Sequence, residues 1–201
     1  MNYFITAIGT DSGKTLVSAI LCKALQADYW KPVQAGFPRD SDTVKSLVPE
    51  CIIHPETYLL NTPASPHASA KIDGVEIDLE KFSLPKTNNA LIVEGAGGCL
   101  VPLNDKDFVI DIPQRLNLPI ILVSNLYLGS INHTLLTINL LKQRNLTVVG
   151  IIFNGKSNPE SERIILKHSD YKTIWHIKEE QEITQTKISE YAEKLKSKLQ
   201  A

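Results

Sequence analysis

Short apolar runs alternate with helix-like patterns along most of the chain. Strands buried on both faces read as such runs, so the pattern predicts a mostly parallel sheet with helices on both faces. We find no internal repeat and no linker, and expect one doubly wound α/β domain over residues 1–201. The predicted strands are residues 2–8, 29–34, 90–94, 119–124, 147–153 and 172–177, and the predicted helices are residues 14–26, 43–48, 68–71, 78–83, 108–116, 131–142, 159–168 and 184–199.

A glycine-rich turn joins the first predicted strand to the first predicted helix. It reads Gly9, Thr10, Asp11, Ser12, Gly13, Lys14 and Thr15. In a phosphate-binding loop (P-loop), backbone N–H groups face phosphate oxygens, the lysine reaches the β- and γ-phosphates, and the hydroxyl holds Mg²⁺. The usual G-x-x-x-x-G-K-[ST] spacing places glycine where this chain has Ile8, so the turn is short. An ordinary turn with a helix-capping Ser or Asp is the alternative.

Polar residues at the carboxyl ends of predicted strands are the other candidates, because ligands bind at that edge of a parallel sheet. Glu94 ends an apolar run and precedes four small residues at positions 95–98, which suits a magnesium-linked carboxylate. Lys31 would neutralise phosphoryl charge. Asp42 is a second candidate for Mg²⁺. Each has an ordinary alternative: a solvated glutamate, an edge lysine, and an N-cap aspartate beginning the helix at 43.

Composition excludes several other functions. The net charge of −1 gives no case for binding nucleic acid or an anionic membrane. The three cysteines form no CxxC pair, so we expect reduced thiols and a cytoplasmic protein. The five histidines lack metal-ligand spacing, and neither His67 nor His133 has a nucleophile to serve.

Several separated segments together resemble the dethiobiotin synthetase family. They match in order and separation over roughly residues 1–155. Besides the turn at 9–15, the segments are Lys31-Pro32-Val33, Ser65-Pro66-His67, residues 93–98, Leu128-Gly129 and Ile131-Asn132-His133.

The resemblance implies a P-loop fold, a homodimer with the substrate site at the subunit interface, and ATP and Mg²⁺ as cofactors. The implied reaction converts 7,8-diaminononanoate, CO₂ and ATP into dethiobiotin, ADP and phosphate through a carbamate and a mixed anhydride. By resemblance, Lys14 and Lys31 are catalytic, and Thr15, Asp42 and Glu94 are the Mg²⁺ ligands. The implied nucleotide-binding residues are Thr10, Asp11, Ser12, Gly13, Lys14, Thr15, Glu94, Gly95, Ala96, Gly97 and Asn154. The implied substrate-binding residues are Lys31, Ser65, Gly97, Gly98 and, from the partner subunit, Gly129, Ser130 and Asn132.

Departures from the family pattern lead to one further expectation. The turn lacks two residues before Gly13, Ala35 replaces a hydroxyl residue, Gly155 replaces an acidic residue, and the usual Gly-Glu-Ile-Pro loop after residue 170 is absent. We therefore expect weak nucleotide binding with poor base discrimination.

Two other functions share these motifs. A nucleotide-driven partitioning switch would carry an extra lysine early in the loop, where this chain has residues 7–10 without one. A related ligase acting on a corrinoid side chain would need room for a second domain, which the length does not give. Both are disfavoured.

Overall fold

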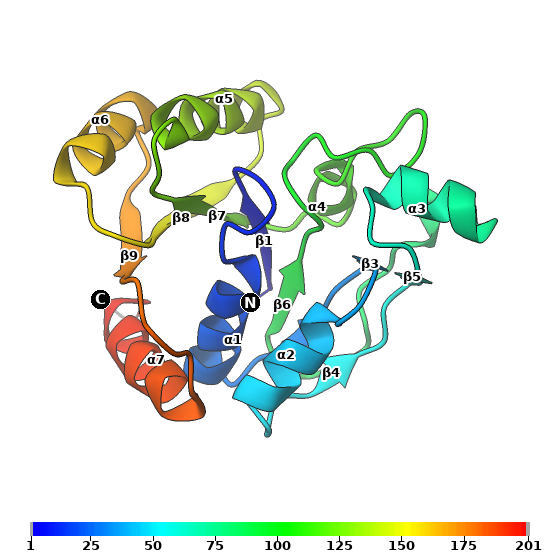
Figure 1. Cartoon of the computed structure of the whole chain (residues 1–201), viewed down its shortest axis with the longest axis horizontal. Helices are drawn as coiled ribbons and strands as arrows, with labels where there is room; N and C mark the ends of the chain where they lie inside the picture. The colour runs from blue at the N-terminus through cyan, green and yellow to red at the C-terminus, as the bar shows by residue number, and fades with distance from the viewer. Residues whose placement is uncertain (1, 200–201) are drawn as a thin grey trace.

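A seven-stranded sheet, in which every pairing is parallel, runs through the computed structural model (Figure 1). The structure describes residues 2–199, and side chains up to residue 196. The strand order is β4-β2-β6-β1-β7-β8-β9. These strands are β1 (Tyr3–Ala7), β2 (Asp28–Trp30), β4 (Ile53–His54), β6 (Leu91–Glu94), β7 (Ile120–Asn125), β8 (Val148–Asn154) and β9 (Thr173–Ile177).

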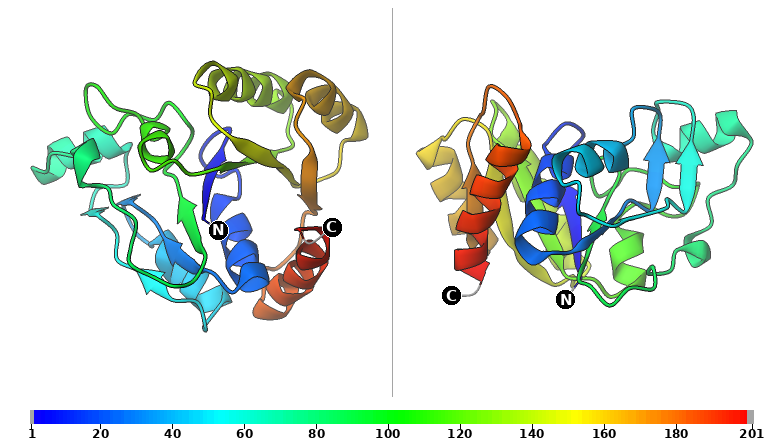
Figure 2. Two further views of the ribbon diagram at one scale, coloured as in Figure 1. Left: turned by 180° about the vertical axis from the view of Figure 1, so that it is seen from behind. Right: turned by 90° about the horizontal axis from the view of Figure 1, so that it is seen from below.

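Helices cover both faces of the sheet, as the two views in Figure 2 show. One core packs α1, α2 and α7 against the sheet, and the other packs α4, α5 and α6 against the opposite face. The helices are α1 (Lys14–Leu25), α2 (Asp40–Leu47), α3 (Pro66–Asp73), α4 (Asp111–Arg115), α5 (Ser130–Gln143), α6 (Pro159–Ser169) and α7 (Gln185–Leu199), with a 3₁₀ turn, η1, at Leu79–Lys81. The expected doubly wound α/β class is confirmed.

The alternation of side chains explains why the strands read as unbroken apolar runs. Phe4 belongs to the core under α4–α6, whereas its neighbour Ile5 belongs to the core under α1, α2 and α7. Both side chains are fully buried. Successive strand residues point to opposite faces, so a strand covered on both sides needs apolar residues at consecutive positions. Each such side chain contributes about 1.5–3 kcal/mol of transfer free energy.

The order of the strands creates a ligand-binding edge next to β1. The chain leaves β1 for β2 and β4, returns through β6 to pair with one side of β1, and then continues with β7 on its other side. A change of direction of this kind opens a crevice at the carboxyl ends of the strands. The turns that follow β1 and β6 both enter that crevice.

The predicted strand over residues 29–34 is wrong in one respect, because the structure divides it. β2 ends at Trp30, and β3 (Val33–Ala35) pairs with β5 (Tyr58–Leu60) in a separate two-stranded sheet. Pro32 lies at the break, where it has no N–H to donate to a sheet. Its carbonyl instead accepts hydrogen bonds from the N–H groups of Thr57 and Tyr58. β4 and β5 were not predicted.

The second helix also begins earlier than the predicted residue 43. Its first residue is Asp40 and its N-cap is Arg39, so Asp42 does not cap it. The buried Gln34 side chain explains the earlier start, because its Oε1 accepts a hydrogen bond from the Asp40 N–H at 3.1 Å. Free N–H groups at a helix start need such partners. The shift brings Asp40 into the first turn.

Two further observations concern covalent links and membrane spans. Cys22, Cys51 and Cys99 are all buried free thiols. Within residues 2–199, we find no helix with the length and apolar character of a membrane span.

Candidate active site

The turn between β1 and α1 closes on its own backbone. The Gly9 carbonyl accepts hydrogen bonds from Ser12 Oγ and from Lys14 Nζ, both at 3.1 Å. Asp11 and Gly13 have positive φ angles of 55° and 94°. Left-handed residues separated by one position turn successive N–H groups toward one side, which is the arrangement that binds anions. The turn therefore keeps an anion-binding geometry although it is short, and its Gly9 carbonyl holds the amino group of Lys14.

Asn154, at the end of β8, makes a hydrogen bond to this turn. Its Nδ2 donates to the Ser12 carbonyl at 3.0 Å. A Cβ on Gly13 would lie 2.3 Å from the same nitrogen, so any side chain there would displace the Asn154 amide. Asn154, expected to contact the adenine edge, thus contacts the backbone of the phosphate turn.

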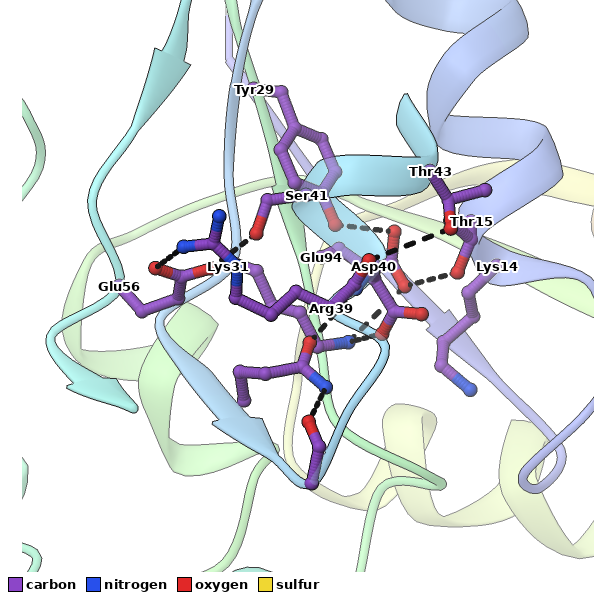
Figure 3. Close-up of polar contacts among 12 residues, drawn as sticks. Lys14, Thr15, Tyr29, Lys31, Arg39, Asp40, Ser41, Thr43, Glu56 and Glu94 are labelled. Carbon is purple, nitrogen blue, oxygen red and sulfur yellow. Dashed lines mark hydrogen bonds and ion pairs between the residues drawn. The ribbon is translucent and has the colours of Figure 1, made fainter. Parts of the chain in front are cut away.

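A buried cluster of charged groups lies beside the turn (Figure 3). Lys31 Nζ is 2.5 Å from Asp40 Oδ2 and 3.3 Å from Glu94 Oε1. Lys31 is 4% exposed and Glu94 is 1% exposed. Charges as buried as these need partners, and here a lysine is paired with two carboxylates.

The two lysines of the site differ in how firmly they hold a proton. Burial acts against the charged form of Lys31, but Glu94 and Asp40 outweigh it, so the pKa of Lys31 is raised. Burial lowers the pKa of Lys14, and the nearby Lys31 lowers it further, while Glu94 opposes both effects. Lys31 is therefore a fixed positive charge at neutral pH.

Thr15 and Glu94 fit a magnesium ion. Thr15 Oγ1 is 2.9 Å from Glu94 Oε1. Neighbouring ligands of an octahedron with bonds of 2.0–2.1 Å are also about 2.9 Å apart. Among residues 2–199, no group of three or more His, Cys, Asp or Glu side chains could hold a metal ion. Mg²⁺ commonly takes one or two protein oxygens and completes its shell with water and substrate phosphates, so the fit is to a nucleotide-bound ion.

Asp42, expected among the Mg²⁺ ligands, is not brought into this cluster. Its side chain is 56% exposed and lies 2.5 Å from Arg39 Nη2 through Oδ1. Asp40, two residues earlier, holds the place beside Lys31. The early start of α2 is the physical reason, because it turns Asp40 rather than Asp42 toward the strand ends.

The second glycine turn, after β6, packs against the first. A Cβ on Gly98 would lie 3.5 Å from the Ala7 carbonyl and 3.7 Å from the Gly9 backbone. Gly97 has a φ of 64°, and a Cβ there would lie 2.8 Å from a Val101 methyl group. The two turns thus lie in van der Waals contact at Gly98, and the tight position is Gly97, within the second turn.

An open, largely apolar pocket of about 630 Å³ adjoins both turns. Three expected site residues, Thr10, Ser65 and Gly98, line it together with His67 and His133. His67 Nδ1 is 3.1 Å from Ser65 Oγ. The histidines therefore border a cavity that suits a flexible apolar chain.

The expected carboxylate-binding residues lie elsewhere, at the start of α5. Gly129 is the N-cap of this helix and borders a different pocket of about 340 Å³. Ser130 is 1% exposed, and its hydroxyl makes no hydrogen bond with the described residues. Asn132 is exposed. Within this chain these residues do not join the cluster around Lys31.

Comparison with known proteins identifies the family. The model of a family described as an AAA domain matches residues 1–187. An ATP-dependent dethiobiotin synthetase BioD from Cytophaga hutchinsonii is 61% identical over 197 residues, which is 96% of this chain and 96% of that protein. Another protein of that name, from Christiangramia forsetii, is 47% identical over 202 residues, or 98% of this chain and 97% of its own. This chain belongs to the dethiobiotin synthetase family.

Solved structures of other proteins share the fold of this family member. A ParA family ATPase from Chlorobium tepidum has a TM-score of 0.57 at 15% identity, covering 99% of this chain and 90% of its own. The septum site-determining protein MinD from Pyrococcus horikoshii, solved with Mg-ADP, has a TM-score of 0.57 at 17% identity, with 98% and 90% coverage. Identities this low concern the fold alone. The much higher identity to the synthetases decides against the partitioning switch.

Sequence reasoning missed two members of the cluster. Asp40 lies two residues before Asp42 in the segment Asp40-Ser41-Asp42, so the acidic signal is present in the sequence but points to two residues. Tyr29 is fully buried and donates its hydroxyl to Glu94 Oε2 at 3.0 Å. Tyr29 lies two positions before Lys31, on the same side of an extended strand, and that spacing was the available signal.

Proposed function

We propose that this chain closes the ureido ring of dethiobiotin, using 7,8-diaminononanoate, CO₂ and ATP and releasing ADP and phosphate. The observation that carries the proposal is the buried contact of Lys31 with Glu94 beside the phosphate-binding turn. It places a fixed positive charge next to the residues that would hold a nucleotide. Family membership supplies the reaction, and this contact supplies groups that suit it.

The chemistry requires positioning and neutralisation of charge more than a protein nucleophile. One amine of the substrate takes up CO₂ to form a carbamate. A carbamate oxygen attacks the γ-phosphorus, and the bond to ADP breaks. The second amine then attacks the carbonyl carbon, and phosphate leaves. Lys31 holds the carbamate close to the γ-phosphate, and Lys14 binds the β- and γ-phosphates.

Thr15 and Glu94 are the residues that would hold Mg²⁺, and Asp42 stays a candidate only if its side chain leaves Arg39. The ion supplies charge neutralisation on the phosphates when it is bound. In this chain, Thr15 presents a hydroxyl from the first turn of α1, and Glu94 a carboxylate from the end of β6. Their separation of 2.9 Å supports the assignment.

The pocket beside the two glycine turns would take the aliphatic chain of the diamine. Val101 and Leu136 are among its apolar lining residues, and Thr10, Ser65 and Gly98 also line it. Gly97 and Gly98 would present backbone groups to the substrate nitrogens, and the turn at 95–97 would approach the nucleotide.

The carboxylate of the substrate would bind at the start of α5 in a second subunit. A helix N-terminus attracts anions, and the buried Ser130 hydroxyl has no hydrogen-bond partner among the described residues. Gly129 and Asn132 frame the same helix end. Leu128, immediately before it, is fully exposed, which supports a homodimer contact here.

Nucleotide binding would use the turn at 10–15 for phosphates and Asn154 for the adenine edge. Because one N–H of the Asn154 amide already donates to the Ser12 carbonyl, its oxygen and its second N–H are left for the base. A cytoplasmic location stays a prediction.

The test is phosphate release from Mg-ATP and bicarbonate with and without 7,8-diaminononanoate. We expect release only with the diamine. Lys31→Ala should lower turnover about a hundredfold or more, the usual loss when a group that stabilises developing charge is removed. Circular dichroism and ADP binding would check that this variant is folded.

Lys23→Ala is the matched control, because Lys23 forms an exposed ion pair with Glu50 on the same side of the sheet but outside the site. It should keep full turnover. Phosphate release without the diamine, or none with it, contradicts the proposed reaction. Near-normal turnover of Lys31→Ala removes Lys31 from the mechanism.

A further inference from the structure

The two oxygens of the Glu94 carboxylate have different partners. Oε1 accepts from Thr15 Oγ1 at 2.9 Å and from Lys31 Nζ at 3.3 Å. Oε2 accepts from the Tyr29 hydroxyl at 3.0 Å. Figure 3 shows the Tyr29 ring reaching Glu94 from the side opposite Lys14 and Thr15. Both oxygens of the carboxylate therefore accept hydrogen bonds within the chain.

The parallel pairing of β2 with β6 places Tyr29 there. Tyr29 lies opposite Ile92, two residues before Glu94, so the three side chains share one face of the sheet. Tyr29 and Ile92 both belong to the core under α1 and α2. The phenol ring thus fills core volume, while its hydroxyl reaches the strand end that carries the carboxylate.

A cation between Thr15 and Glu94 would change the partners of Oε1 only. It would take the Oε1 lone pair that now accepts from Thr15, and its charge would repel the ammonium of Lys31. The bond from Tyr29 to Oε2 does not compete with the cation. It is the contact that keeps Glu94 in place when its other partners turn to the nucleotide.

We propose that Tyr29 is a positioning residue for Mg²⁺ binding: its hydroxyl fixes the Glu94 carboxylate so that Oε1 faces Thr15. This inference rests on the proposed function, since it takes Glu94 as a ligand of the ion. Tyr29 is fully buried, so it would act on the ion only through Glu94. Groups that orient a metal ligand in this way commonly change metal affinity 10–100-fold when removed.

The test is the affinity of Mn²⁺ for the complex with ADP, followed by the electron paramagnetic resonance signal of free Mn²⁺. Tyr29→Phe keeps the buried ring and removes only the hydroxyl. We expect its dissociation constant for Mn²⁺ to rise about tenfold. ADP affinity without metal should be unchanged, because the hydroxyl has no contact with the phosphate turn.

Tyr58→Phe is the matched control. Tyr58 is also buried, and its hydroxyl accepts one hydrogen bond, from the N–H of Asp78, which is not a residue of the site, at 3.0 Å. If Tyr29 had a structural role alone, both variants would lose thermal stability and neither would lose Mn²⁺ affinity. Equal Mn²⁺ affinity in Tyr29→Phe and wild type overturns the proposal.

Two further outcomes separate this inference from the proposed function. A wild-type protein that binds no Mn²⁺ with ADP contradicts the metal role of Glu94 and the proposal together. A crystal structure of the wild type with Mg²⁺ and ADP is a second test, and it does not depend on the folding of any variant. We expect the ion on Oε1, with Tyr29 still bonded to Oε2; an ion on both oxygens, with the Tyr29 hydroxyl displaced, overturns the proposal.

Discussion

At the scale of single residues, the site depends on charges that are buried in compensating pairs. Lys31 lies among Glu94 and Asp40 with almost no exposure to solvent. Removing one member of such a group leaves an uncompensated charge and commonly costs about 3–5 kcal/mol. Each member of the cluster is therefore needed to keep the others paired. Asp40 is partly exposed and gives the ammonium a second partner when Glu94 turns to a cation.

Asp28, at the other end of β2, gives a pH-dependent prediction. Its buried carboxylate accepts hydrogen bonds from Thr87 Oγ1 at 2.7 Å and Asn89 Nδ2 at 2.9 Å, and lies 2.9 Å from His54 Nε2. Burial would raise the pKa of Asp28, but the hydrogen bonds outweigh it and the pKa is lowered. A lowered folded-state pKa stabilises the fold above the unfolded value of about 3.9, and this is lost as the pH falls through the folded-state pKa.

The check is the free energy of unfolding of wild type and Asp28→Asn, from denaturant titrations between about pH 6 and pH 3. Wild type should be more stable near pH 6, and its advantage should shrink as the pH is lowered. An advantage that stays constant over that range would rule out this assignment.

Part of the site could be predicted from residue order alone. Thr15 and Glu94 each follow an apolar strand, and the carboxyl ends of parallel strands lie at one edge, so their meeting followed from the pattern. Asp40 could not be distinguished from Asp42, because the choice depends on which residue begins α2. Tyr29 could not be assigned either, because its contact depends on the register of β2 against β6.

At the scale of elements, the shortened turn after β1 is the least usual feature. Three residues separate Gly9 from Gly13, so the turn offers fewer N–H groups to a phosphate than the usual spacing does. Asn154 occupies the space beside Gly13 and bonds to the turn. Binding a nucleotide would then require the Asn154 amide to serve both the turn and the base.

This geometry supports the expectation of weak and poorly selective nucleotide binding. Calorimetry with ATP and GTP in the presence of Mg²⁺ should give dissociation constants within about tenfold of each other, since strong discrimination needs a site with dedicated hydrogen bonds to the base. Tight ATP binding with strong rejection of GTP would refute the expectation. Titration with ADP and GDP would give the same comparison without turnover.

The elements themselves were largely predictable, and the exceptions have physical causes. Long periodic segments such as α5 and α7 have nearly the predicted bounds. The break at Pro32 went unrecognised because the apolar residues continue across it, and β4 and β5 are too short to show an alternating pattern.

At the scale of the whole molecule, the face around the start of α5 stays apolar and exposed. Leu128 is fully exposed, and Tyr127, Ile131 and Leu136 are exposed nearby. The same helix also lines the pocket beside the phosphate turn, because Leu136 is one of the lining residues of that pocket. A second subunit on this face would cover apolar surface and place the start of α5 next to a neighbouring site.

Leu128→Asp tests this arrangement. Placing a charge in an apolar contact should shift the protein from dimer to monomer in sedimentation velocity and lower turnover with the diamine. ADP binding should be unchanged, because the nucleotide residues come from one chain. Ile52→Asp, at an exposed apolar residue next to β4, is the control and should stay dimeric. A wild-type monomer with full turnover would contradict the shared site.

In the proposed reaction, a carbamate oxygen attacks the γ-phosphorus of ATP. Turnover with ¹⁸O-labelled bicarbonate in water of normal isotopic composition tests it most directly, if the reaction is quenched before CO₂ exchanges oxygen with water. The carbamate oxygen that attacks phosphorus leaves with the phosphate, so the released phosphate should carry one ¹⁸O per turnover. Phosphate free of ¹⁸O, formed together with the ureido product, would exclude attack by a carbamate oxygen on phosphorus.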